Sequence, residues 1–341
     1  MKYTKEQLML TFSYMSYYGF GLEGSDSENA IKIAKDVNKA LKTWKPVKNK
    51  WELVWGPCAF AFKGDKFDDN LMFVVRGNED PGKLVVAIRG TNPLSLKDWL
   101  IEDFDVVPMT KWKYGEKAKG LNPKISRGTD VGLTHLQEMV ATEGVPGAGL
   151  SLLQFLQEAA NEKKETEICV TGHSLGGALA PTLALWLKDI QGTEMPVNAN
   201  ISTVAFAGPS AGNEDFANYS DQRFGDQCVR IANSLDVVPY AWNTKSLSQL
   251  YFLYKPHLLF PGPILFGGFG LMIAMSFLGK YHQIKADTPA LNGVYKPLLY
   301  NYFAQGLYQH AVGYPEIMGM LKNDDIPLAE LFSGQLDLSV L

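Results

Sequence analysis

A regular alternation of strands and helices over residues 167–232 constrains the fold more than any other feature of the sequence. The segments follow one another as strand 167–171, helix 175–190, strand 201–207, helix 214–219 and strand 227–232. Strands joined through helices lie parallel in one sheet, with the helices on its two faces. The sequence therefore predicts an α/β fold with a mostly parallel central sheet that is flanked by helices.

The segments before this region predict further elements of the same fold. Helical spacing or a capping box predicts helices at 4–19, 25–41, 95–104 and 150–164, and strands are expected at 51–62, 71–76 and 83–88. Neither an internal repeat nor a low-complexity linker divides the chain. We therefore expect residues 1–341 to form a single domain, with 1–50 as N-terminal helices.

Composition and charge exclude several classes of protein. Hydrophobic residues make up 46% of the chain and charged residues 20%, which excludes a disordered or collagen-like chain. The net charge is −4 and the sequence has no basic stripe, which argues against binding to nucleic acid. Three cysteines without C-x-x-C spacing argue against a disulfide framework and a zinc site, and no metal or organic cofactor is indicated.

The start of the chain lacks the apolar run and cleavage site of a secretory signal. We expect a protein that is cytoplasmic or peripheral at a lipid surface, although a secreted form whose signal has been removed would have the same sequence. The oligomeric state is not indicated.

Gly172-His173-Ser174-Leu175-Gly176 fits the G-x-S-x-G pattern of a nucleophile elbow. In such an elbow a serine occupies a tight, strained turn between a strand and a helix, where flanking glycines avoid collisions with the backbone. The N–H groups and the dipole of the following helix favour a developing oxyanion. The pattern predicts Ser174 as a nucleophile.

A second match, Gly208-Pro209-Ser210-Ala211-Gly212, also lies between a strand and a helix. Glu214 and Asp215 follow it and would place negative charge where an oxyanion needs positive potential. Small residues follow Ser174 instead and allow the next helix to pack close to the sheet. We interpret Ser210 as a turn residue.

A serine nucleophile needs a base and an acid that orients the base, in the chain order serine, acid, histidine for this arrangement. Asp236 comes directly after the strand 227–232, at the carboxyl end where open α/β sheets bind ligands. Asp221 and Asp226 precede that strand and would lie at its other end. The histidines His257, His282 and His310 follow Ser174, and spacing alone leaves the base open among them.

The strand 83–88 runs into Arg89-Gly90-Thr91, where a loop N–H could be the second donor of an oxyanion hole. The segment 92–108 follows, with apolar residues that include Trp99 and Leu100 at helical spacing. It is either a surface helix packed on the core or a mobile lid.

Five ordered sequence blocks together resemble the class 3 lipases, the fungal-type triacylglycerol lipases of the α/β-hydrolase fold. The blocks are Ala87-Ile88-Arg89-Gly90-Thr91, Asp98-Trp99, Gly172-His173-Ser174-Leu175-Gly176-Gly177, Ala207-Gly208-Pro209-x-x-Gly212-Asn213-x-x-Phe216, and Arg230-Ile231-Ala232-Asn233-x-x-Asp236-Val237-Val238-Pro239. The resemblance covers roughly residues 50–315.

The resemblance implies a role for each matching residue. Ser174 is implied as nucleophile, Asp236 as triad acid, and Thr91 with Leu175 as oxyanion-hole residues, with 92–108 as a lid-like segment. The family's catalytic histidine lies near the C-terminus, shortly before an aromatic residue, and His310 with Tyr314 matches this arrangement. His282 and His257 are the alternatives.

The segment 258–278 has 21 residues without a charge, inside an apolar insertion of about residues 245–300. Proline and glycine at 261–263 limit an unbroken helix to 264–278, roughly 22 Å long and short of a bilayer core. The segment could be a membrane span, a buried core helix, or a cap that binds acyl chains or a lipid surface. We favour the cap, with Phe266, Phe269 and Leu271 contacting substrate.

These features predict a lipase or esterase that hydrolyses esters of acylglycerols at a lipid–water interface, without a transmembrane span. A phospholipase A1 or an aryl or feruloyl esterase on the same scaffold is the alternative. A catalytically silent, lipase-like interaction module is an alternative of another class. Fold alone does not distinguish their substrates.

Overall fold

The computed structural model of the protein describes residues 3–19, 22, 26–60, 70–90, 108–259, 262–322 and 324–332. These residues divide into two compact units. Unit 1 comprises Met1–Gly90, Val131–Ala205 and Arg223–Val229, and unit 2 comprises Thr91–Asp130, Phe206–Gln222 and Arg230–Leu341. The expectation of a single domain over 1–341 stays a prediction. The predicted helix 95–104, and the lid-like segment except for residue 108, lie outside the described residues.

A six-stranded sheet has the order β1-β2-β3-β6-β7-β9. Its strands are β1 (Trp51–Phe60), β2 (Asn70–Gly77), β3 (Lys83–Ile88), β6 (Thr166–His173), β7 (Ala199–Phe206) and β9 (Cys228–Ile231). The first three strands pair antiparallel, and β3 pairs parallel with β6, with Leu84 opposite Ile168. All six strands agree with the predicted segments to within two residues at each end that the structure describes.

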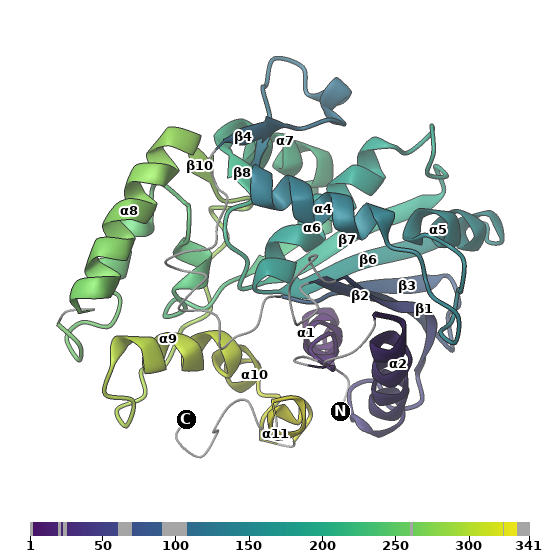
Figure 1. Ribbon diagram of the computed structural model, residues 1–341, viewed down its shortest axis with the longest axis horizontal. Helices are drawn as coiled ribbons and strands as arrows, with labels where there is room; N and C mark the ends of the chain where they lie inside the picture. Colours follow the sequence, from purple (N-terminus) through teal and green to yellow (C-terminus); the bar gives the residue numbers. More distant parts are fainter. Residues whose placement is uncertain are drawn as a thin grey trace. The chain divides into compact units, whose positions relative to one another are not determined.

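Helices of unit 1 cover both faces of this sheet. They are α1 (Lys5–Met15), α2 (Asp26–Thr43), α4 (Arg127–Glu138, mostly in this unit), α5 (Leu152–Asn161) and α6 (Leu175–Asp189). Helices α1 and α6 both contact β3 and β6, and they lie on opposite sides of the strands (Figure 1). The sequence did not predict α4.

Helix α6 is buried from Gly176 to Asp189. The small residues Gly177, Ala178 and Ala180 begin it, so its backbone approaches the sheet closely, as the sequence predicted. The strands beneath it are buried almost throughout, as expected for strands covered on both faces: β3 has five consecutive buried apolar residues and β6 has three, Ile168, Cys169 and Val170. This contact fixes the turn between β6 and α6, where Ser174 lies.

Unit 2 contains a second, four-stranded sheet that the sequence did not predict. Its strands, in the order β10-β8-β5-β4, are β4 (Met109–Lys111), β5 (Lys124–Ser126), β8 (Gly212–Asn213) and β10 (Tyr281–His282), and neighbouring strands pair antiparallel. The helices of this unit are α7 (Glu214–Phe224), α8 (Pro263–Gly279), α9 (Tyr302–Ala311), α10 (Gly313–Ile317) and α11 (Leu328–Leu331). Its short 3₁₀ helices are η2 (Gly115–Lys117), η4 (Val238–Tyr240) and η5 (Leu247–Phe252), whereas η3 (Gly225–Gln227) belongs to unit 1.

The apolar insertion forms much of the core of unit 2. Its buried side chains gather in one cluster: Val237, Val238, Ala241, Trp242, Leu247, Leu250, Tyr254, Phe269, Met272, Tyr281 and Tyr302. The buried tyrosines satisfy their hydroxyls on backbone carbonyls, since Tyr254 donates to Leu235 and Tyr302 to Leu250. Helix α8 begins at Pro263, where a missing N–H is harmless, and extends the predicted helix by one residue at each end.

The reactivity of the three cysteines provides a test of how unit 1 is packed. Cys58, Cys169 and Cys228 are free and buried, and burial raises the pKa of Cys58 to about 12 and also raises that of Cys169. Because the thiolate is the reactive form, we expect the native protein to leave all three unmodified by a disulfide reagent at pH 8. The unfolded protein in guanidinium should release all three. A native thiol that reacts as fast as in the unfolded chain would contradict this packing.

Candidate active site

Ser174 occupies a strained turn between β6 and α6. Its backbone has φ 63° and ψ −126°, a conformation that residues other than glycine seldom adopt. Ser174 holds the N-cap position of α6, yet its side chain makes no capping hydrogen bond. The first N–H groups of a helix have no partner within it, and here they include that of Leu175. The turn therefore has the backbone of a nucleophile elbow.

The two glycines of the motif are required because three backbone segments approach closely. A Cβ at Gly172 would collide with the carbonyl oxygen of Gly176 and lie 2.9 Å from its Cα. A Cβ at Gly176 would collide with the carbonyl oxygen of Ile88 and lie 3.0 Å from the carbonyl carbon of Arg89. The end of β3 thus lies directly against the elbow, as the predicted oxyanion loop requires.

Gly90 extends this contact to the nucleophile itself. A Cβ there would lie 2.8 Å from the Cβ of Ser174 and 2.6 Å from the hydroxyl of Tyr17. The same Tyr17 hydroxyl lies 2.8 Å from Nδ1 of His173, the residue before the nucleophile. Tyr17 therefore supports both the elbow and the loop. Tyr17 was not predicted from the sequence, in which only the tyrosine-rich helical segment 4–19 pointed to this region.

In unit 2, Asp236 is fully buried and its carboxylate has three donors. Oδ2 lies 2.9 Å from Nδ1 of His310 and accepts from the hydroxyl of Tyr314 at 2.8 Å, and Oδ1 accepts from the Val238 N–H at 3.0 Å. Buried carboxylates persist when they are paired and hydrogen-bonded. The sequence placed Tyr314 only as an aromatic after the histidine, so its role as a donor is new.

The loop that carries Asp236 is fixed by Asn233. Its backbone N–H donates to the hydroxyl of Tyr314, its side-chain amide donates to the carbonyl and side chain of Gln309, and its Oδ1 accepts from the Leu235 N–H. Burial raises the pKa of the nearby Tyr240 hydroxyl, and the charge of Asp236 adds to this shift. The carboxylate thus stands in a low-polarity, hydrogen-bonded setting.

The alternative histidines have other surroundings. His282 lies in β10 opposite Gly212, and burial lowers its pKa. The ring of His257 stacks on that of Tyr295, with centroids 4.1 Å apart. His310 is the one of the three for which a hydrogen bond to Asp236 is found.

The alternative acids and the second serine are also placed. Asp221 accepts hydrogen bonds from the Lys285 N–H, and Asp226 lies in η3, before β9. Ser210 is buried, and the positive φ in its segment belongs to Ala207. Ser210 therefore lacks the elbow conformation of Ser174.

Some of the other predicted site residues lie in the part of the chain that the structure describes, and some do not. Thr91, Trp99 and Leu100 lie outside the described residues. On α8, Phe269 is buried in the core cluster, whereas Phe266 and Leu271 are about half exposed. Their contact with substrate stays a prediction.

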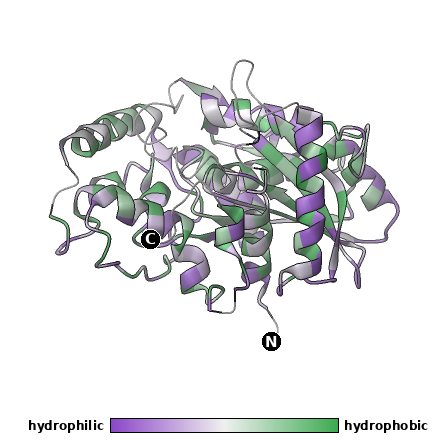
Figure 2. Ribbon diagram, turned by 60° about the horizontal axis from the view of Figure 1, so that its bottom comes forward, coloured by the Kyte–Doolittle hydropathy of each residue, from purple (hydrophilic) through white to green (hydrophobic). Residues whose placement is uncertain are grey.

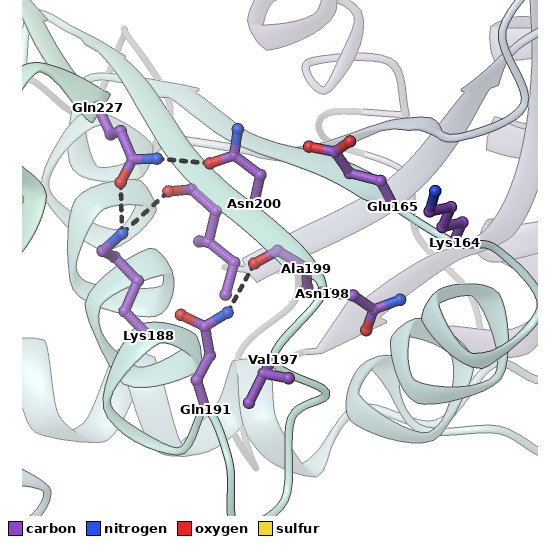
Figure 3. A pocket seen from close by; sticks show the side chains of 10 residues that line it. Lys164, Glu165, Lys188, Gln191, Val197, Asn198, Ala199, Asn200 and Gln227 are labelled. Carbon is purple, nitrogen blue, oxygen red and sulfur yellow. Dashed lines mark hydrogen bonds between the residues drawn. The ribbon is translucent and has the colours of Figure 1, made fainter.

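A hollow of about 440 Å³ in unit 1 lies at the opposite end of β6 from Ser174 (Figure 3). Its polar side chains pair with one another, since Lys188 donates to Gln227 at 2.5 Å and Gln227 donates to Asn200 at 2.5 Å. Gln191 donates to the carbonyl of Ala199. These polar side chains of the hollow are therefore already hydrogen-bonded within the protein.

Among the described residues, no group of three or more histidine, cysteine, aspartate or glutamate side chains could hold a metal ion.

Comparisons with known proteins identify the family of the chain. The family model described as "Lipase (class 3)" matches residues 85–245. The crystal structure of M37 lipase is 51% identical, covers 97% of this chain and 96% of its own, and gives a TM-score of 0.92. The chain belongs to the class 3 lipases. Its fold is the α/β-hydrolase fold, and it is a carboxylic ester hydrolase.

Curated relatives match shorter parts. The secreted mono- and diacylglycerol lipase MDL2 of Malassezia globosa is 28% identical over 158 residues, 46% of this chain and 45% of that protein. Phospholipase A1-II 1 of Oryza sativa subsp. indica is 41% identical over 78 residues, 23% of this chain and 19% of that protein. The matches therefore span less than half the length of either relative.

The hydroxyl of Tyr314 can be tested separately from its ring. Tyr314→Phe removes one donor to a buried carboxylate and the acceptor of the Asn233 N–H. We expect about 2 kcal/mol of lost stability in urea unfolding, since hydrogen bonds to charged groups contribute about 1.5–3 kcal/mol. The exposed Tyr300 is the matched control, and Tyr300→Phe should change nothing measurable. Equal unfolding midpoints for the two variants would contradict the role of Tyr314.

Proposed function

We propose that the chain hydrolyses carboxylic esters of acylglycerols, with Ser174 as nucleophile, His310 as base and Asp236 as the acid that orients the base. The observation that carries the proposal is the backbone of Ser174, which is held in the elbow conformation by the close approach of β3 and α6. The buried pair of His310 and Asp236 in unit 2 supports it.

The reaction proceeds in two halves. The Ser174 hydroxyl attacks the ester carbonyl carbon while Nε2 of His310 takes its proton, which forms a tetrahedral intermediate. Collapse of the intermediate breaks the bond to the alcohol, and His310 returns the proton to it. Water then attacks the acyl-enzyme by the same route, which releases the fatty acid and restores Ser174.

Asp236 and the oxyanion donors assist these steps without forming bonds to substrate carbon. Asp236 accepts from Nδ1 of His310, which favours the tautomer whose Nε2 is the basic nitrogen that takes the serine proton. The N–H of Leu175 is proposed as one oxyanion donor and Thr91 as the other, and each such donor contributes about 3–4 kcal/mol. The lid-like role of 92–108, with Trp99 and Leu100, belongs to the same proposal and is supported by the resemblance.

Phospholipase A1 activity is the second candidate, favoured by the match to the rice phospholipase. A hydrolysis profile over p-nitrophenyl esters, triacylglycerols and phosphatidylcholine distinguishes the two. Preference for acylglycerols supports the proposal, and preference for the sn-1 bond of phosphatidylcholine supports the alternative. Activity confined to aryl or feruloyl esters would indicate an esterase.

Substitution of the two serines tests the nucleophile. We expect Ser174→Ala to lower kcat by at least about 10⁴, because members of a triad act as a unit, whereas Ser210→Ala should retain most activity. A fluorophosphonate should label the parent protein and Ser210→Ala but not Ser174→Ala. Labelling of Ser174→Ala would move the nucleophile elsewhere, and an unlabelled, inactive parent protein would indicate a silent module.

The base is tested with a pair of histidines. We expect His310→Ala to lower kcat by at least about 10³, whereas His282→Ala should have little effect because its ring lies in the small sheet. Steady-state hydrolysis of a dissolved ester measures both. A nearly active His310→Ala variant, together with an inactive His282→Ala variant, would assign the base to His282.

A further inference from the structure

Helix α8 presents an exposed face without a single polar side chain. Its exposed residues are Pro263, Phe266, Gly267, Gly270, Leu271, Ala274, Phe277 and Leu278, which we call the outer face of α8. At 3.6 residues per turn they fall on one side of the helix, within an arc of about 140°. The helix is coloured as hydrophobic along its length in Figure 2, on the left as in Figure 1.

The polarity of α8 is the reverse of that of an ordinary surface helix. Its only polar side chain, Ser276, is fully buried and donates to the carbonyl of Trp242 at 2.7 Å. The opposite side exposes 63% of Phe277 and 76% of Leu278 to solvent. A surface helix normally turns charged and polar residues outward, so a contiguous apolar face of this kind marks an interaction surface.

Two apolar side chains that precede α8 in the sequence are exposed as well. Phe252 and Leu259 are exposed by 59% and 72%, and η5, which ends at Phe252, packs against α8. Tyr251 joins the two elements, since its ring lies 4.7 Å from that of Phe266 and its hydroxyl donates to the Phe266 carbonyl. Phe266, at one edge of the outer face, therefore packs against η5.

The chain segment that carries the outer face has charges of one sign. Between Asp236 and Asp287 the sequence contains four lysines and no acidic residue, although acids outnumber bases in the whole chain by 36 to 32. Three of these lysines are exposed. Lys245 pairs with Glu214, whose N–H also donates to the carbonyl of Lys280. Lys255 lies before α8 and Lys280 directly after it. An apolar centre with cationic ends complements a surface that has hydrocarbon beneath anionic head groups.

We propose that the outer face of α8 docks the protein onto anionic phospholipid surfaces. The helix lies in the plane of the surface with its apolar side chains about 5–10 Å deep, and Lys255 and Lys280 reach the head groups. None of the described helices is long and apolar enough to cross a membrane, which fits docking at one leaflet. A protein partner fits less well, because non-obligate protein interfaces are about as polar as the rest of the surface.

This inference extends the proposed function, because it names the surface on which the substrate is met. Its test is therefore made on Ser174→Ala protein, which leaves vesicle lipids intact whatever the outcome for catalysis. Flotation with vesicles of phosphatidylcholine containing phosphatidylglycerol measures the partition coefficient, and pure phosphatidylcholine vesicles test the requirement for anionic lipid.

Three variants separate apolar contact, charge and general exposure. Phe277→Ser with Leu278→Ser should lower partitioning by about a hundredfold, roughly tenfold for each apolar side chain. Lys255→Gln with Lys280→Asn should lower it severalfold on anionic vesicles only, where asparagine suits the left-handed backbone of residue 280. Val197, which is 79% exposed in unit 1, is the matched control, and Val197→Ser should bind like the parent.

A single reactive cysteine gives a second measurement that does not depend on the loss of binding. Since the native thiols are buried, a Phe277→Cys protein can be labelled there alone with an environment-sensitive dye. Its emission should shift to the blue with anionic vesicles, whereas a dye at Val197→Cys should not respond.

Two outcomes would overturn the proposal. One is unchanged partitioning of the Phe277→Ser, Leu278→Ser protein with a silent dye at residue 277. The other is a lipid-free dimer that the same substitutions dissociate, which would make the outer face a contact between copies of the chain. A loss of Ser174-dependent hydrolysis is a separate result, because docking is measured without turnover.

Discussion

The close approach of three backbone segments in unit 1 determines the candidate active site. The end of β3, the end of β6 and the first turn of α6 meet where a single added Cβ at any of Gly90, Gly172 or Gly176 would collide with a backbone oxygen. Packing of this density leaves Ser174 one backbone conformation. The strain of that conformation is sustained by the buried strands and helix around it, as is common at functional sites.

The second constraint is the burial of a carboxylate in unit 2. A charge that is removed from water needs several donors, and Asp236 receives them from His310, Tyr314 and a backbone N–H. The backbone donor Val238 lies in the same loop as Asp236, whereas His310 and Tyr314 come from α9 and α10, more than 70 residues further along the chain. The loop after β9 and these two helices must therefore fold together before the site exists. The same requirement orients the imidazole ring, so stability and orientation depend on the same contacts.

The sequence predicted the elements whose pattern is local. The strands β3 and β6 and the helix α6 were found because a continuous apolar run and a series of small residues each signal burial without reference to the rest of the chain. The four-stranded sheet of unit 2 was missed, since its strands have two or three residues and obtain their partners from distant segments. Tyr17 and Tyr314 were missed as hydrogen-bonding residues because a hydroxyl carries no periodicity, and its partner is known only after folding. Thr91 illustrates a further limit, as it was predicted by its place after β3 and lies outside the described residues.

The buried hydroxyl of Ser276 has a consequence for how α8 is oriented about its own axis. Because the helix is apolar on every side, hydrophobic burial alone would stabilise many rotations almost equally. A rotation by one residue, about 100°, would remove the hydroxyl from the carbonyl of Trp242 and from the side chain of Thr244. The hydrogen bonds of this one serine therefore favour a single rotation of α8 about its axis. They contribute little to the total stability, but they distinguish one rotation from others of similar energy. A buried side chain of α8 therefore determines which of its apolar side chains are exposed to solvent.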